Sequence, residues 1–268
     1  MSNTFSLAIA TPTHRGLFSA SSSYVRSVWG LQSACIGRGI PVELLLLPNL
    51  TMVDRARNLL ASFFLHKTNF THMLFLDDDM GFAVDDVMRM FEWHRLDVVA
   101  AMYGSKNIDW ARIRDAVLTY PDADPSWLAQ VAGRIDGMHT FLRDTDSATE
   151  ALHTRIPVRE IGTGIMLISR AYLERLIAAG IPSAAPDASS DHPVHEFFRQ
   201  KVIDGRLVGE DFYFCNLVRE HGGTVYGCAW PRTVHSGPYD FVSDVQAMAV
   251  MRRFTPPAFP SHACVWSR

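Results

Sequence analysis

Three consecutive aspartates are the residues of this sequence best suited to chemistry. Asp77, Asp78 and Asp79 follow an apolar run at 74–76 that is typical of a buried strand. Open α/β sheets bind ligands beyond the carboxyl ends of their strands, where carboxylates can hold Mg²⁺ or Mn²⁺. A lone acidic pair would more often be a loop or a helix cap. Adjacent like charges cost free energy unless a cation or hydrogen-bond donors neutralise them, so the triplet predicts an ion or ligand site.

Two further groups could take part in chemistry. Glu210 and Asp211 begin a helix predicted at 209–221, where the helix dipole stabilises carboxylates and capping is the ordinary interpretation. The functional interpretation is a general base, with Asp211 taking a proton from an acceptor hydroxyl during displacement at a sugar carbon. His235 follows the last predicted strand, and a neutral imidazole is a good ligand for Mn²⁺ or a transition metal, although a lone histidine is more often structural.

Alternating strands and helices must position these residues, as in a doubly wound sheet. Thr51 or Asp54 would cap the second helix, and Phe63 would belong to its buried face. We expect strands at 5–10, 42–47, 71–76 and 97–102, and helices at 22–37, from the cap to about 66, and at 84–93.

The second half of the chain is less regular. Residues 107–155 form an excursion of the kind that carries specificity, and the polar stretch 182–193 predicts a mobile loop. A strand pair, or a strand, turn and strand, is predicted at 156–168, broken by a glycine turn at 162–164. Beyond it we expect a helix at 170–179 and a strand at 224–229.

Composition indicates one folded α/β domain. The 268 residues are 48% hydrophobic with a net charge of −3, which excludes a small disulfide-stapled scaffold and wholesale disorder. The sequence shows no signal peptide and no apolar run long enough to cross a membrane, so we expect a soluble, cytoplasmic protein. The cysteines lack metal-site or disulfide spacing and predict reduced thiols: Cys35, Cys215, Cys228 and Cys264.

Charge is distributed unevenly along the chain. Residues 1–67 carry six lysines and arginines against two acids, Glu43 and Asp54. This N-terminal third is therefore a candidate for holding an anion.

Four motifs occur in an order that resembles a known family. They are FLDDD at 75–79, GTGIMLISR at 162–170, EDFYF at 210–214 and HSG at 235–237. In this order they resemble the nucleotide-sugar-dependent glycosyltransferases of the GT-A fold, in particular the family-two-like group. The resemblance implies a single GT-A domain over residues 1–268, with a mostly parallel sheet flanked by helices. It implies a nucleotide-sugar-binding half at 1–106, an acceptor-side half at 107–240 and a C-terminal tail at 241–268.

The resemblance also implies roles for individual residues. Asp77, Asp79 and His235 would ligate a divalent ion, Mn²⁺ or Mg²⁺, that grips the donor diphosphate, with Asp77 alternatively near the donor ribose. Asp211 would be the base of an inverting transfer, with Glu210 as the neighbouring candidate. Donor contacts are implied for Thr11, Pro12, Thr13, Asp54, Arg57, Asp77, Asp78 and Lys106. Tyr103 and Lys106 would face either donor or acceptor. Acceptor-side contacts are implied for Gly162, Thr163 and Gly164, although the ordinary need for glycine in a tight turn explains this segment equally well.

The function implied is metal-dependent transfer of a sugar from a nucleoside-diphosphate donor, UDP-linked, to a hydroxyl acceptor of unknown class: glycan, protein, small molecule or modified DNA. One alternative is a phage-type enzyme that glycosylates hydroxylated DNA bases. Alternatives of other classes are a nucleotidyltransferase, whose glycine-rich loop after the first strand is poorly matched, and a non-catalytic nucleotide-sugar-binding module. The lack of a QxxRW motif and of a membrane domain argues against a processive polysaccharide synthase. The stretch 183–193, or the tail after Ser236, would close over the donor as a lid.

Overall fold

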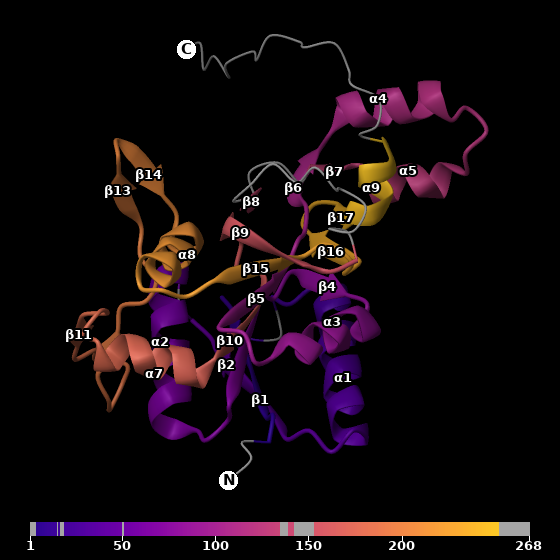
Figure 1. Cartoon of the computed structure of the whole chain (residues 1–268). Coiled ribbons are helices and arrows are strands. Elements are labelled where there is room, and N and C mark those ends of the chain that lie inside the picture. The colour runs from indigo at the N-terminus through magenta and orange to yellow at the C-terminus, as the bar shows by residue number, and fades with distance from the viewer. Residues whose placement is uncertain are drawn as a thin grey trace.

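An eight-stranded sheet runs through the middle of the molecule, with helices on both of its faces (Figure 1). The computed structural model describes residues 4–14, 16, 19–49, 51–134, 139–141 and 153–251. The strands of this sheet, in spatial order, are β2 (Val42–Leu47), β1 (Leu7–Pro12), β3 (His72–Leu76), β10 (Ile165–Ser169), β5 (Val98–Ala101), β15 (Val225–Cys228), β9 (Arg155–Ile161) and β8 (His139–Phe141).

The predicted α/β class with a mostly parallel sheet is confirmed. Among the described strands of the sheet, β10 and β9 run against the other six. The two strands predicted at 156–168 and the turn between them are confirmed as strand, turn and strand, but β9 and β10 do not pair with each other. β10 lies between β3 and β5, and β9 pairs with β15. The turn at 162–164 therefore carries the chain from the outer part of the sheet back to its centre.

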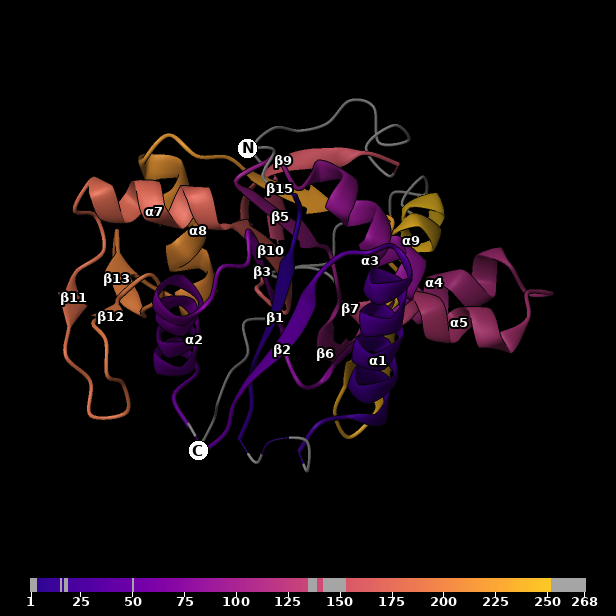
Figure 2. The same ribbon diagram turned by 90° about the horizontal axis from the view of Figure 1, so that it is seen from below.

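Two helical layers cover the sheet (Figures 1 and 2). The alternation of side chains along each strand buries both faces: Met73 and Phe75 of β3 contribute to one hydrophobic cluster, and Leu74 and Leu76 contribute to the other. The first layer holds α2 (Val53–Lys67), α7 (Arg170–Ala178) and α8 (Glu210–Glu220), and the second holds α1 (Ser22–Gly37), α3 (Val84–Met90) and the 3₁₀ turn η1 (Phe91–Trp93).

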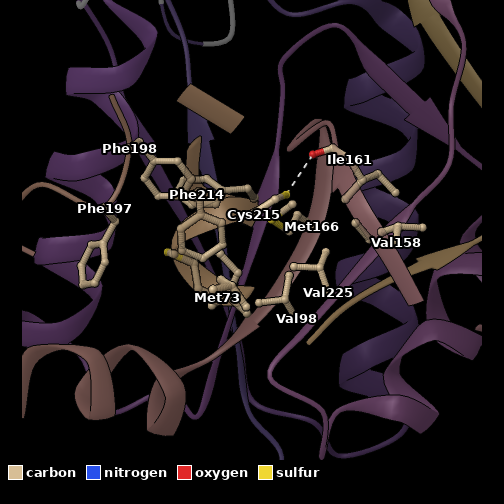
Figure 3. Packing of buried hydrophobic residues seen from close by; sticks show 14 of the residues in the cluster. Met73, Val98, Val158, Ile161, Met166, Phe197, Phe198, Phe214, Cys215 and Val225 are labelled. Atoms are coloured by element: carbon tan, nitrogen blue, oxygen red, sulfur yellow. Dashed lines mark hydrogen bonds between the residues drawn. The ribbon is translucent and has the colours of Figure 1, made fainter. Parts of the chain in front are cut away.

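Side chains of α8 pack against neighbouring elements in the first layer (Figure 3). The Phe214 ring stacks on Phe198 with their centroids 4.6 Å apart, and Phe198 meets Phe75 of β3 edge to face. The buried Cys215 thiol lies 3.4 Å from the Ile161 carbonyl oxygen at the end of β9. These contacts set the position of the first turn of α8 relative to the ends of the central strands.

Several local expectations are corrected by the structure. The helix at 22–37 is confirmed, with Ser21 as its N-cap. The N-cap of α2 is Met52, which has no side-chain capping bond, so neither Thr51 nor Asp54 caps this helix. Phe63 is 43% exposed and does not join the buried face, because that face is narrower than the apolar spacing suggested. Among the described cysteines, Cys35, Cys215 and Cys228 are free and buried, and Cys264 lies outside the described residues.

Smaller elements surround the sheet. A three-stranded sheet of β17 (Asp240–Ser243), β16 (Thr233–Ser236) and β4 (Met80–Phe82) joins distant parts of the chain. In the described part of the chain, no helix is long and apolar enough to cross a membrane. The other elements are β6 (Ser105–Ile108) with β7 (Gly133–Arg134), β11 (Ala184–Ala185) with β12 (Val194–His195), β13 (Lys201–Ile203) with β14 (Arg206–Val208), and the helices α4 (Trp110–Thr119), α5 (Pro125–Val131) and α9 (Val245–Met251).

Candidate functional site

A tight turn at the carboxyl end of β3 directs the three aspartates toward different partners. The amide N–H of Met80 donates to the Asp77 carbonyl at 3.0 Å, which closes a four-residue turn between β3 and β4. The amide of Asp77 donates to the Gly164 carbonyl at 3.1 Å, so the turn is attached to the start of β10. Because each side chain leaves the turn in its own direction, three adjacent negative charges can be neutralised separately.

The Asp77 carboxylate is held by a buried arginine. Arg57 donates from both terminal nitrogens to the two Asp77 oxygens, at 2.9 and 3.1 Å, and its side chain is only 4% exposed. The Arg57 Nε also lies 3.5 Å from Glu210 Oε1. Burial by itself would lower the pKa of Arg57, but Asp77 and Glu210 outweigh it and keep the guanidinium charged. One buried cation therefore joins α2, the end of β3 and the start of α8.

The Asp78 carboxylate organises the loop that follows β1. Its Oδ2 accepts hydrogen bonds from Thr13 Oγ1 at 2.7 Å and from Ser19 Oγ at 3.0 Å. Its backbone carbonyl accepts from the N–H of Ser21, the residue that caps α1. Asp78 thus fixes the residues that form one wall of the site.

Asp79 faces a lysine and a histidine. Lys106 Nζ on β6 pairs with Asp79 Oδ2, and His235 Nε2 lies 3.6 Å from Asp79 Oδ1. Burial alone would raise the pKa of Asp79, but His235 and Lys106 outweigh it and hold that pKa below its ordinary value. His235 lies inside β16 and not after the last strand as expected. β16 pairs with β4, and β4 is the strand that directly follows the aspartate turn.

The side chains of Asp79 and His235 fit a divalent ion. His235 Nδ1 lies 2.9 Å from the Gly104 carbonyl, which can only accept, so Nδ1 donates to it and Nε2 is the ring nitrogen that faces Asp79. Asp79 Oδ1 is buried and has no hydrogen-bond partner among the described residues. A carboxylate oxygen and an imidazole nitrogen form a donor pair suited to Mn²⁺. The described residues bring no third His, Cys, Asp or Glu close enough to complete a metal cluster, and Asp77 is directed to Arg57 instead.

These groups border a cleft of about 600 Å³ at the carboxyl ends of β1 and β3. Of the residues implied in donor binding, five line this cleft and three do not. Thr11 is fully buried and bonds to the Tyr24 hydroxyl at 2.8 Å, Arg57 is buried as described, and Asp54 borders a neighbouring groove. The cleft is lined by Pro12, Thr13, Asp77, Asp78, Asp79 and Lys106, and by residues that the sequence did not indicate for the donor: His14, Ser19, Ser21, Thr51, Val53, Ala56, Ser236 and Gly237.

Asp211 and Glu210, the two carboxylates at the start of α8, have different partners. Burial, with the adjacent negative charge of Glu210, raises the pKa of Asp211 to about 6. Its Oδ1 accepts from the N–H of Phe212 at 2.8 Å, within the first turn of α8. Glu210 is the carboxylate that lies beside Arg57. The two carboxylates thus lie in different surroundings, neither of them lines the aspartate cleft, and the assignment of the base stays a prediction.

Tyr103 lies between the glycine turn and His235. Its buried hydroxyl accepts from the Gly164 N–H at 3.1 Å, and its ring meets the His235 ring edge to face, with centroids 5.6 Å apart. Burial, followed by the charge of Asp77 and more weakly that of Asp211, raises the pKa of this phenol far above its ordinary value, so it stays protonated. The sequence could not assign Tyr103 to donor or acceptor, and the structure places it behind the site as a buried support.

The glycine turn at 162–164 has a packing role. A Cβ at Gly164 would lie 2.8 Å from the Tyr103 hydroxyl oxygen, so only glycine allows this approach. Gly162 and Thr163 are buried as well, and Thr163 Oγ1 has no hydrogen-bond partner among the described residues. The acceptor-side role implied for this turn stays a prediction, and the buried position favours support of Asp77 and Tyr103.

The polar stretch proposed as a lid is fastened to α2. Arg55 donates to both carboxylate oxygens of Asp187, at 2.7 and 3.0 Å, and Lys67 pairs with Asp191 at 2.6 Å. His195 of β12 lies with its Nε2 3.2 Å from that of His66. None of the residues that line the aspartate cleft comes from this stretch.

A second groove of about 810 Å³ adjoins the cleft. The two share Thr51 and Val53 at the start of α2. Its far wall is formed by Glu196, Arg199 and the beginning of the β13–β14 hairpin, which leads directly into α8. Asp54, expected to contact the donor base or diphosphate, borders this second groove.

Comparison with known proteins finds similarity to solved structures at low sequence identity. No protein-family model and no curated protein matches this sequence. Among solved structures, A197 from STIV is 15% identical with a TM-score of 0.46, covering 87% of this chain and 86% of that one. The catalytic domain of Drosophila β1,4-galactosyltransferase 7, in complex with xylobiose, is 11% identical with a TM-score of 0.43 over 90% and 70% of the two chains. S. aureus TarS 1–349 in complex with UDP-GlcNAc is 11% identical with a TM-score of 0.37 over 89% and 58%. At these values the similarity assigns no residue role.

Proposed function

We propose that this protein is a metal-dependent glycosyltransferase of the family-two-like GT-A group. It transfers a sugar from a nucleoside-diphosphate sugar, linked to UDP, to an acceptor hydroxyl. The observation that carries the proposal is the position of Asp79 Oδ1, buried without a hydrogen-bond partner among the described residues, beside His235 Nε2 at a polar cleft. That position, beyond the carboxyl ends of the strands, is where open α/β sheets bind ligands.

Asp79 and His235 are the residues that would hold the divalent ion, with Mn²⁺ favoured over Mg²⁺ because one donor is a nitrogen. When bound, the ion supplies a Lewis acid that offsets charge developing on the leaving nucleoside diphosphate. Asp77 and Asp78 already have protein partners, because Arg57 pairs with Asp77 and the Thr13 and Ser19 hydroxyls donate to Asp78. Their proposed role is to keep the cleft walls in place beside the donor.

Asp211 is the proposed base. The acceptor oxygen forms a bond to the anomeric carbon while the bond from that carbon to the phosphate oxygen breaks. The hydroxyl proton passes to Asp211, and the nucleoside diphosphate leaves. A carboxyl with a pKa of about 6 is ionised at neutral pH yet basic enough to accept this proton. The acceptor is proposed to enter through the groove of Glu196 and Arg199, since it is continuous with the cleft at Thr51 and Val53.

Slow donor hydrolysis tests this proposal without knowledge of the acceptor. With Mn²⁺ and a panel of UDP-sugars, the wild-type protein should release UDP, with water replacing the acceptor. Asp79→Ala and His235→Ala should each reduce the rate by at least about 100-fold, because each removes one of two protein ligands. A matched control is Asp191→Ala, whose carboxylate pairs with Lys67 away from the cleft and should leave the rate unchanged. UDP release at the wild-type rate by the Asp79 and His235 variants would contradict the metal assignment.

A further inference from the structure

We propose that Lys106 is an exchangeable counter-ion of Asp79, which yields this carboxylate to the divalent ion when a nucleoside diphosphate enters and then pairs with the diphosphate. The inference rests on the proposed function and adds an order of events to it. It predicts that metal and nucleotide bind cooperatively, and it identifies Lys106 as the residue responsible for this coupling.

The first argument for this exchange is the position of Lys106. It lies on β6, and its ammonium pairs with Asp79 Oδ2, while His235 Nε2 faces the other oxygen, Oδ1. The side chains of Lys106 and Asp79 are 38% and 30% exposed, and both border the 600 Å³ cleft. The pair is thus at the surface of the proposed donor site and can rearrange without disturbing the core.

The second argument is the space around the Lys106 side chain. A Cβ built at Gly237 would lie 3.2 Å from Lys106 Cδ and 3.8 Å from Cε. The glycine of the HSG motif therefore leaves room for the aliphatic part of the lysine beside the cleft. A lysine ammonium on a four-carbon chain can turn between two anions, which the planar, more rigid head of an arginine does less readily.

The third argument is the repulsion between the Lys106 ammonium and a divalent ion. A divalent ion held by Asp79 and His235 would lie next to the Lys106 ammonium, and two cations on one carboxylate repel each other strongly inside a partly buried cleft. Metal alone therefore competes with the lysine for Asp79 and leaves the ammonium charge less compensated. A diphosphate removes this penalty, because its oxygens accept both the metal and the ammonium. Such coupling is reciprocal: nucleotide must strengthen metal binding by the same factor by which metal strengthens nucleotide binding.

Titration of Mn²⁺, followed by the electron paramagnetic resonance signal of the free ion, tests the inference without turnover. Without nucleotide, Lys106→Met should bind Mn²⁺ at least about tenfold more tightly than wild type, since the competing cation is gone. Saturating UDP should strengthen Mn²⁺ binding at least about tenfold in wild type and clearly less in Lys106→Met. Lys106→Gln should behave like the methionine variant. Lys67→Met is the matched control, because Lys67 is 39% exposed and pairs with Asp191 on the surface, and it should match wild type.

The outcomes separate this inference from the proposed function. Equal Mn²⁺ affinity and equal coupling in wild type and Lys106→Met, with binding lost in Asp79→Ala, would overturn the exchange and leave the metal site standing. Weaker Mn²⁺ binding in both Lys106 variants would also overturn it, because the lysine would then be positioning Asp79 for the ion. Mn²⁺ affinity that is unchanged by Asp79→Ala would contradict the proposed function itself.

Discussion

At the scale of residues, the aspartate triplet resolves into three separate chemical environments. Arg57 neutralises Asp77, the Thr13 and Ser19 hydroxyls donate hydrogen bonds to Asp78, and among the three only Asp79 has a buried oxygen without a hydrogen-bond partner in the described structure. The repulsion among the three adjacent aspartates is therefore offset mainly by side chains of the protein itself. The proposed metal site consequently narrows to Asp79 and His235.

The raised pKa of Asp211 leads to a prediction about pH. As a base, Asp211 must be ionised, so the rate of Mn²⁺-dependent UDP-sugar hydrolysis should rise with pH through about 6 and then level off. Asp211→Asn should lower the plateau by about 100-fold or more. Glu210→Gln removes the neighbouring charge that helps to raise the pKa of Asp211, so its rising limb should shift to lower pH. A wild-type profile that is flat between pH 5 and 8 would contradict the assignment of Asp211.

Folding stability supplies the control for Asp211→Asn. The folded-state pKa of about 6 lies above the ordinary value of 3.8, so the neutral form favours the folded state. That contribution is fully present below about pH 3.8 and is lost as the pH rises through about 6. At pH 7.5 the asparagine variant should therefore be at least as stable as wild type in urea unfolding, so a loss of rate cannot be attributed to misfolding.

At the scale of elements, α2 is the member that connects the site to the rest of the fold. It supplies Arg57 to β3 and α8, and Arg55 to the stretch at 183–193. Asn58 binds both backbone groups of Phe198, its side-chain N–H₂ donating at 2.7 Å and its oxygen accepting at 2.9 Å. A displacement of α2 would thus move the donor cleft and the second groove together.

Two arginines of α2 provide a matched test of this role. Arg57→Met should lower the free energy of unfolding by about 3 kcal/mol or more, because it leaves Asp77 and Glu210 without their buried cation. Arg55→Met breaks a partly exposed pair with Asp187 and should cost less than about 1 kcal/mol. Urea unfolding of both variants measures the difference. Equal losses in the two variants would show that the buried bridge does not stabilise the fold more than a surface pair.

At the scale of the whole molecule, ion pairs reduce the positive charge that the basic N-terminal third, residues 1–67, can offer to a ligand. Three of its six cations, Arg55, Arg57 and Lys67, are paired with acids from elsewhere in the chain, and Arg15 lies outside the described residues. The region is therefore less available to an extended anion such as duplex DNA than its sequence suggested. For this reason the geometry gives no specific support to the DNA-glycosylating alternative.

Ligand binding should be visible in the stability of the whole molecule. A ligand that binds only the folded state at 100 times its Kd adds about 2.7 kcal/mol, which corresponds to several degrees of Tm for a chain of this size. We expect UDP with Mn²⁺ to raise the Tm by about 5 °C, and UDP or Mn²⁺ alone to raise it much less. Differential scanning fluorimetry against a panel of nucleotides measures this. A panel in which no nucleotide with Mn²⁺ shifts the Tm would argue against a nucleotide-sugar site.

The sequence by itself determined the class of the fold and the order of its chemical motifs. Strands buried on both faces must be short apolar runs, and a helix on a sheet must repeat its apolar residues with helical spacing, so β2, β3 and α1 could be located from the pattern alone. The strand end before Asp77 and the helix start at Glu210 followed from the same patterns.

Only the tertiary structure decided which groups meet. Periodicity encodes whether a residue is buried but not which strand lies beside it, so the antiparallel β10 and the position of His235 inside β16 were not foreseen. The partners that define the site come from distant segments: Arg57 for Asp77, and Lys106 for Asp79. Their contacts depend on how layers pack and where a turn directs each side chain, and no local spacing in the sequence carries that information.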